Sequence, residues 1–280
     1  MKGKQQSSIN FKVILICSFF LLLFFLVMRS TFSNSQNSSK ISEPNPTTKC
    51  PSHSCTKISA SLANALVHYA TSNITPQQTF KEISVSLKVL QKKSPCNFLV
   101  FGLGHDSLMW TSLNHGGRTV FLEEDESWIQ QIKAQNPSLE SYHVVYNTKL
   151  TEADELHDVG MQEHCKVVSD PRKSKCQLAL KGFPGEVYDV EWDLIMVDAP
   201  TGYFDGAPGR MSAVYTAGLM ARNRANGDTD VFVHDVDRAV EDRFSKSFLC
   251  EGYLVEQEGR IRHFNIPSHT SRLGTPFCPH

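Results

Sequence analysis

The region from residue 97 to residue 237 alternates short apolar runs with stretches of helical spacing, and this alternation restricts the possible fold more than any other feature. The apolar runs have the length and composition of buried strands. They occupy residues 97–103, 118–125, 142–148, 192–200 and 229–237, and residues 253–266 contain two further candidate strands. Helical spacing is found at 58–70, 79–93, 107–114, 126–135, 211–223 and 238–249. Such alternation predicts an α/β fold with a mostly parallel, doubly wound, Rossmann-like sheet that is covered by helices on both faces.

Polar residues gather at the points where four of these strands end. In a doubly wound sheet, ligands bind beyond the carboxyl ends of the strands. The residues at those ends are Gly102, Gly104, His105 and Asp106, then Glu123, Glu124 and Asp125, then Asp198, and finally His234, Asp235 and Asp237. A single carboxylate in such a place is usually a helix cap, but polar groups at four strand ends indicate a ligand site.

The turn after the first strand has the pattern Gly102-x-Gly104, which lets the backbone pass close to a ligand. Glu123 lies 19 residues beyond Gly104, where an acid that binds a ribose is expected. Ser107 occupies the position of the third glycine of the dinucleotide pattern, and Asp106 would repel a pyrophosphate. A sulfonium and an ammonium group tolerate that carboxylate, so these residues favour S-adenosylmethionine over NAD.

Two neighbouring residues extend this predicted cofactor site. Glu124 is the alternative contact to the ribose, and His105 is a candidate contact to the cofactor or to a sugar. A simpler interpretation of the same turn is that Asp106 caps the helix that follows it.

The N-terminus differs in character from the rest of the chain. Residues 13–28 contain no charged side chain, and as a helix these 16 residues would cover roughly 24 Å, close to the thickness of a thin membrane. A cleaved signal peptide is the alternative, but no small-x-small cleavage site follows the run directly. Lys2, Lys4 and Lys12 precede the run and only Arg29 follows it closely, so we expect a cytosolic N-terminus and a lumenal domain.

The predicted organisation is a cytosolic tail at 1–12, a transmembrane signal anchor at 13–28, a lumenal stem at 29–57 and one globular domain at 58–280. The stem consists mainly of Ser, Asn, Thr and Pro and has almost nothing to bury. The whole chain carries 28 basic and 29 acidic residues, a net charge of −1. Because nucleic-acid binding normally needs a concentrated basic surface, this composition predicts no nucleic-acid partner.

Seven of the eight cysteines follow the predicted anchor, and this odd number leaves at least one thiol free or intermolecular. No CxxC pair occurs, which argues against a zinc site. Cys165 and Cys176 flank a polar insertion and suit a disulfide that closes a loop. The other pairings stay open.

Three blocks of sequence closely resemble the plant glucuronoxylan 4-O-methyltransferase family, and the resemblance extends over roughly residues 60–270. The blocks are NFLVFGLGHDSLMWTSLNHGGRTVFLEEDESWI at 97–129, WDLIMVDAPTGY at 192–203 and VFVHDVDR at 231–238. The resemblance implies a class I methyltransferase that moves a methyl group from S-adenosylmethionine to O4 of the glucuronic acid side chains of glucuronoxylan. It also implies a single-pass type II protein of the Golgi membrane, with glucuronoxylan and other xylan-synthesis proteins as partners. The irregular-xylem proteins share the same domain.

Asp198 and Asp235 are the predicted catalytic pair. They end neighbouring strands, at the places where catechol O-methyltransferase-like enzymes hold a divalent ion, and oxygen ligands suit magnesium or manganese. Val236 stands where those enzymes carry an amide, so the third ligand is missing from the pattern. His234 is the candidate general base if no metal binds. The alternative is that Asp198 caps a turn and Asp235 caps the next helix.

The acceptor that the resemblance implies is anionic, so a cationic partner is expected near the methyl donor. Arg210 opens a helix shortly after Asp198, and a guanidinium binds a carboxylate through two hydrogen bonds. Tyr203 and Phe204 in the preceding loop offer rings that face a sugar. If Arg210 does not bind the carboxylate, Arg118 and Arg238 are the next candidates.

Two other functions use the same residues differently. An NAD-dependent sugar oxidoreductase would have the same fold, but Ser107 and Asp106 disfavour it. A non-catalytic, membrane-tethered organiser of xylan synthesis would not need Gly102, Gly104 and Glu123 together. Binding of S-adenosylmethionine separates these functions.

Overall fold

The computed structural model describes residues 59–272 and 274–279. The predicted tail, anchor and stem, at residues 1–57, lie outside the described part of the chain. Among the helices that are described, none is both long enough and apolar enough to cross a membrane.

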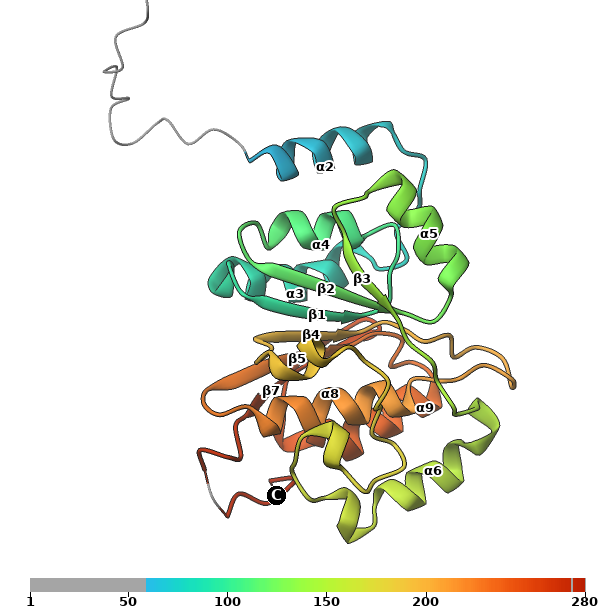
Figure 1. The fold of residues 1–280 in the computed structure, drawn as a ribbon, viewed down its shortest axis with the longest axis vertical. Coiled ribbons are helices and arrows are strands. Elements are labelled where there is room, and N and C mark those ends of the chain that lie inside the picture. The colour runs from blue at the N-terminus through green and yellow to red at the C-terminus, as the bar shows by residue number, and fades with distance from the viewer. Residues whose placement is uncertain (1–58, 273, 280) are drawn as a thin grey trace, which may run out of the picture. The chain divides into compact units, whose positions relative to one another are not determined.

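A seven-stranded sheet forms the centre of the domain, with the strand order β3-β2-β1-β4-β5-β7-β6 (Figure 1). The strands are β1 (Asn97–Phe101), β2 (Arg118–Glu123), β3 (Glu140–His143), β4 (Leu194–Val197), β5 (Asp228–Val233), β6 (Leu254–Glu258) and β7 (Ile261–Pro267). Strands β1 to β5 are parallel, whereas β7 runs antiparallel to both β5 and β6. The order reverses between β1 and β4, where doubly wound sheets bind their ligands. The predicted mostly parallel, doubly wound sheet is confirmed.

Helices lie on both faces of this sheet (Figure 1). They are α2 (Ala60–Thr71), α3 (Phe80–Lys93), α4 (Ser107–Leu113), α5 (Glu126–Gln135), α6 (Ala153–Gly160), α7 (Gly185–Asp189), α8 (Met211–Asn223) and α9 (Ala239–Phe244). Side chains of β1 alternate between two cores, as a strand buried on both faces requires. Phe98 and Val100 pack in the core that includes residues of α3, α4 and α5. Leu99 and Phe101 pack in the core that includes residues of α6, α8 and α9.

Two parts of the helical pattern differ from the sequence-based expectation. The polar insertion after residue 148 contains α6 and α7, which were not predicted. The helix predicted at 238–249 is α9 followed by a π-helical segment, Ser245–Cys250. Both helices of the insertion are short, with 8 and 5 residues, so neither offers the long apolar periodicity that identifies a helix in sequence.

Two disulfides fasten segments of the domain that have little secondary structure. Cys165 and Cys176 are bonded across 11 residues of the insertion, which confirms the predicted loop closure. Cys250 and Cys278 are bonded across 28 residues and attach the C-terminal segment. Among the described cysteines, Cys96 is free and buried.

Candidate active site

The turn after β1 brings the backbone against the end of β4. Gly102 has a φ of 122°, and a Cβ at this position would lie 3.2 Å from the Cβ of Ala199, so glycine fits here without strain. The N–H of Gly104 donates to the Oγ of Ser107 at 2.9 Å. The turn therefore has the close backbone approach that its glycines predicted, and Ser107 ties it to α4.

Glu123 connects the turns that follow β1 and β2. Its carboxylate accepts the backbone N–H groups of Leu103 at 3.0 Å, Glu124 at 2.9 Å and Asp125 at 3.1 Å. Burial raises the pKa of Glu123 even though these hydrogen bonds favour its charged form. Glu124 accepts the N–H of Thr201 at 3.0 Å and is less buried. The ribose contact stays a prediction for both Glu123 and Glu124. The side chain of Glu124 is the more accessible of the two.

Asp106 lies at the start of α4 but does not cap it, so the capping interpretation of this turn is wrong. Its Oδ2 accepts the indole N–H of Trp110 at 2.8 Å. Burial, followed by the negative charge of Asp198, raises the pKa of Asp106 to about 6. The neighbouring His105 is exposed, with its ring edge-on to Trp128 at 5.2 Å between centroids.

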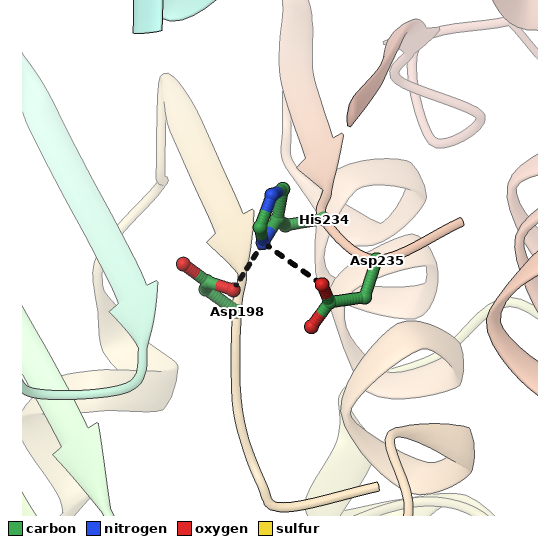
Figure 2. A group of neighbouring side chains, drawn as sticks. All are labelled: Asp198, His234 and Asp235. Carbon is green, nitrogen blue, oxygen red and sulfur yellow. Dashed lines mark hydrogen bonds and ion pairs between the residues drawn. The ribbon is translucent and has the colours of Figure 1, made fainter. Parts of the chain in front are cut away.

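Asp198, His234 and Asp235 form a compact cluster beyond β4 and β5 (Figure 2). The Nδ1 atom of His234 lies 2.9 Å from Oδ1 of Asp198 and 3.5 Å from Oδ1 of Asp235. One donor atom from each residue lies within 4.8 Å of the other two, so the cluster offers the His–carboxylate ligand set of a divalent ion. The strand ends therefore bring together all three residues that the sequence singled out here.

Three arginines surround Asp235. Oδ2 lies 2.8 Å from Nη2 of Arg210 and 2.8 Å from Nη2 of Arg238, and Oδ1 lies 2.7 Å from Nη1 of Arg260. Arg210 also reaches Oδ1 of Asp198 at 3.3 Å, so one guanidinium bridges the two carboxylates. Charge on Asp235 is thus compensated by the chain itself.

Asp198 is the more accessible acid of the cluster. Its side chain is 16% exposed, whereas those of His234 and Asp235 are 2% and 6% exposed. Burial opposes its ionisation, but the hydrogen bond with His234 and the charge of Arg210 hold the pKa of Asp198 below its ordinary value. Asp198 is therefore held in its ionised form and is the least buried side chain of the three.

Two further residues come from the start of α3, and the sequence analysis did not identify them. Gln78 Nε2 donates to Oδ2 of Asp198 at 3.1 Å. Glu82 Oε1 lies 4.0 Å from Nε2 of His234. Thr79 and Glu82 form a capping box at the start of α3, within the stretch of helical spacing predicted at 79–93.

The residues predicted to contact the acceptor lie in different surroundings. Arg210 is buried, with its side chain 6% exposed, and it also donates to the carbonyl oxygen of His234 at 2.8 Å. Arg238 is 30% exposed. Arg118 begins β2 and pairs with Glu140 at 2.6 Å, so it lies at the opposite end of the sheet and does not fit this role.

An aromatic loop adjoins the cluster. Tyr203 and Phe204 are 74% and 52% exposed, with ring centroids 5.4 Å apart. Phe204 also lines a cavity of about 430 Å³, together with Glu124, Tyr146 and Thr201. The hydroxyl of Tyr146 is buried and has no hydrogen-bond partner within residues 59–272 and 274–279. The cavity therefore lies between the end of β2 and the loop that follows β4.

Residues 81–264 match a family model described as IRX15/IRX15L/GXM. Over the full length of the chain, the sequence is 62% identical to glucuronoxylan 4-O-methyltransferase 2 of Arabidopsis thaliana, of which the alignment covers 98%. It is 54% identical to arabinogalactan O-methyltransferase 2 of the same plant, covering 76% of each chain. It is 36% identical to the protein IRX15-LIKE of that plant, covering 98% of this chain and 90% of the relative.

Solved structures with a similar fold are more distant. A putative caffeoyl-CoA O-methyltransferase from Staphylococcus aureus is 13% identical, with a TM-score of 0.42, over 75% of this chain and 93% of that one. An O-methyltransferase from Bacillus cereus is 14% identical, with a TM-score of 0.39, over 74% and 91% of the two chains.

Proposed function

Because the chain belongs to the IRX15/IRX15L/GXM family, we propose that it transfers a methyl group from S-adenosylmethionine to O4 of the glucuronic acid side chains of glucuronoxylan. The observation that carries this proposal is the 60–62% identity, over the whole chain, to three glucuronoxylan 4-O-methyltransferases of Arabidopsis thaliana. The site described above supports it with a cofactor-type turn next to an acidic cluster.

The cofactor is assigned to the carboxyl ends of β1 and β2. Gly102 and Gly104 let it approach the backbone, and Glu123 or Glu124 accepts from its ribose hydroxyls. His105 is the exposed contact on the rim of the same turn. S-adenosylmethionine supplies an electrophilic methyl group, and the residues of the chain orient it and exclude water.

The acceptor hydroxyl is a poor nucleophile, so the chain must hold it in line and receive its proton. Asp198 is placed for this task because it is ionised and is the accessible member of the cluster. His234 lies behind it and fixes its orientation through the 2.9 Å contact. In the absence of a metal, Asp198 rather than His234 is the candidate base, because the side chain of His234 is only 2% exposed and that of Asp198 is 16% exposed.

A divalent ion is the alternative route to the same chemistry. Asp198, His234 and Asp235 present a fitting donor set, and an ion held there would acidify the hydroxyl. Arg210 bridges the same two carboxylates, so it would have to share them with the ion. Exhaustive chelation separates the routes: full activity afterwards rejects the ion, and loss that manganese or magnesium restores supports it.

The acceptor sugar is assigned to the side of the cluster that carries Tyr203 and Phe204, whose exposed rings suit contact with a pyranose face. Arg210 and Arg238 are the candidate partners of its carboxylate. The burial of Arg210 favours Arg238 for direct contact. Replacement of each by alanine, assayed on glucuronic acid and on neutral glucose side chains, identifies the residue whose loss removes the preference for the acid.

The decisive test of the function uses the full-length chain in detergent, with S-adenosylmethionine and either glucuronoxylan or arabinogalactan. We expect methyl transfer to O4 of glucuronic acid on glucuronoxylan, identified by NMR of the product. Absence of cofactor binding in calorimetry would reject the enzyme function in favour of a non-catalytic organiser. Stronger methylation of arabinogalactan would move the chain to the acceptor class of its 54%-identical relatives.

The cellular assignment is a proposal of its own. The type II orientation, with residues 13–28 as the anchor, is inferred from the charge pattern of the N-terminus. The Golgi location and the xylan-synthesis proteins as neighbours are what the resemblance to the glucuronoxylan 4-O-methyltransferase family implies. Protease treatment of sealed microsomes tests it, because the domain should be protected until detergent is added.

A further inference from the structure

Helix α3 precedes the first strand of the sheet, yet its start reaches the ends of β4 and β5. Gln78 lies just before the N-cap of this helix and Glu82 lies in its first turn, and both are buried, with 4% and 2% exposure. Neither belongs to a strand end, where the other residues of the site are found. The topology of the sheet therefore does not explain why these two residues contact Asp198 and His234.

Gln78 donates a hydrogen bond to Oδ2 of Asp198. Oδ1 of Asp198 is held by Nδ1 of His234 at 2.9 Å and by Nη2 of Arg210 at 3.3 Å, whereas Oδ2 accepts Nε2 of Gln78 at 3.1 Å. The contacts on both oxygens together fix the rotation of the carboxylate. The carbonyl oxygen of Gln78 is buried and has no hydrogen-bond partner among the described residues, an arrangement that is unfavourable for a polar atom. Packing alone therefore does not explain a glutamine at this position.

Glu82 lies beside the other ring nitrogen of His234. Its Oε2 accepts the N–H of Thr79 at 2.6 Å, which completes the helix cap. Its Oε1 accepts the N–H of Arg260 at 2.7 Å and lies 4.0 Å from Nε2 of His234, a nitrogen that has no hydrogen-bond partner in the described part of the chain. A Cβ on Gly259 would lie 2.7 Å from this oxygen, so the β6–β7 turn leaves room for it. Asp198 and Glu82 thus flank the two ring nitrogens of His234.

Arg260 joins the same segment to the rest of the cluster. Its guanidinium pairs with Asp235 at 2.7 Å and donates to the carbonyl oxygen of Gln77 at 2.7 Å. The segment that leads into α3 is therefore attached to the side chains of both strand ends.

We propose that the start of α3 is a positioning element of the active site, in which Gln78 orients Asp198 through a hydrogen bond and Glu82 places a carboxylate beside the second ring nitrogen of His234. The consequence for the methyl transfer rests on the proposed function. The geometry of the element does not depend on it.

Gln78→Ala tests the first contact. Loss of an outer-shell partner of a metal ligand typically costs roughly 10–100-fold in metal affinity or activity, and we expect kcat to fall by a similar factor. The KM values and the affinity for S-adenosylhomocysteine should stay within about 2-fold, since Gln78 has no assigned substrate contact. Gln78→Glu, which places a second carboxylate beside Asp198, should be at least as impaired. Lys81→Ala, on the exposed face of the same turn, is the control and should retain wild-type turnover. A kcat of Gln78→Ala within about 2-fold of wild type would overturn the assignment.

Glu82→Gln and Thr79→Ala separate positioning from helix capping. Thr79→Ala removes the side chain that accepts the N–H of Glu82 at 3.3 Å but leaves the Glu82 carboxylate in place. Both variants should lower the melting temperature, because each weakens the cap. Only Glu82→Gln should lower kcat per folded molecule, by roughly 10-fold. Equal turnover in the two variants contradicts the role of Glu82.

A spectroscopic readout keeps this proposal distinct from the proposed function. In protein labelled with ¹⁵N-histidine, the ring-nitrogen resonances of His234 should shift in Gln78→Ala and in Glu82→Gln but not in Lys81→Ala. Unchanged resonances reject the positioning element even if wild type is active. An inactive wild type that shows the shifts rejects the proposed function alone.

Discussion

The site lies at the carboxyl ends of the parallel strands, and its two halves consist of different kinds of chemical group. Beyond β1 and β2, the chain uses backbone groups: Gly102 gives a close approach, and Glu123 accepts three main-chain N–H groups. Beyond β4 and β5, it uses charged side chains, with Asp235 held by three arginines. The half beyond β1 and β2 is defined by the path of the backbone. The half beyond β4 and β5 is a cluster of carboxylates and arginines whose charges compensate one another. Substitutions should therefore act through binding in the first half and through turnover or stability in the second.

Asp198→Asn should give the largest effect on turnover. The amide keeps the size of the side chain but cannot receive a proton or bind an ion as a carboxylate does. We expect kcat to fall by roughly 10²–10⁴-fold, with unchanged affinity for S-adenosylmethionine. Steady-state kinetics and calorimetry measure the two quantities, and a variant that keeps a tenth of its turnover would contradict the catalytic role.

Asp235→Asn should be dominated by stability. Removal of this charge leaves Arg210 buried beside two further guanidinium groups without their shared partner. Breaking a buried ion pair costs about 3–5 kcal/mol, and the partial exposure of Arg238 and Arg260 places the expected loss at about 3 kcal/mol. Urea unfolding measures it. A variant as stable as Asp198→Asn would remove the distinction between the two carboxylates.

Glu123→Ala should weaken binding of S-adenosylmethionine by about 1–3 kcal/mol, because three N–H groups lose their acceptor and the turns lose their brace. Turnover at saturating cofactor should change much less. Glu124→Ala is the matched comparison in calorimetry. A larger loss in Glu124→Ala would assign the ribose contact to Glu124, and no loss in either variant would remove the cofactor from this edge.

Asp106 gives the smallest expected effect, a pH dependence. Its pKa is raised to about 6 in the folded protein, so between about pH 4 and pH 6 the folded state binds more protons at this residue than the unfolded state. The free energy of unfolding should therefore fall as pH rises through this window. Asp106→Asn should lack this contribution and gain stability relative to wild type as pH rises. Parallel curves for the two proteins between pH 4 and pH 6 would contradict the shift.

The sequence predicted the parts of the molecule that depend on local pattern. The alternation of strands and helices identified β1 to β5, and strand-end logic identified Asp198, His234 and Asp235 as neighbours. The sequence did not predict the contact between Gln78 and Asp198, because the two residues are 120 positions apart and the segment around Gln78 carries only the signal of a helix start. The sequence did not predict the ion pair of Arg260 with Asp235 either, because an arginine in a hairpin turn usually has a solvated side chain. Contacts made by tertiary packing leave no periodicity to detect.

The role of Arg210 shows the same limit from another side. Its place at the start of α8 was correctly predicted, and a free guanidinium near the acceptor was a reasonable expectation from that place. The structure pairs this guanidinium with both carboxylates of the cluster, a property that composition and spacing do not encode.

The two disulfides set a condition on how the protein should be prepared. Cys250 and Cys278 attach the C-terminal segment beside Arg222, a buried guanidinium that donates to backbone carbonyl groups and to Cys250 Sγ. Material made in a reducing cytoplasm would lack this bridge and the one in the insertion, at a cost of about 2–4 kcal/mol each. Thiol titration after denaturation therefore measures whether both disulfides have formed in a preparation. Of the five described cysteines, only Cys96 should react in correctly oxidised protein.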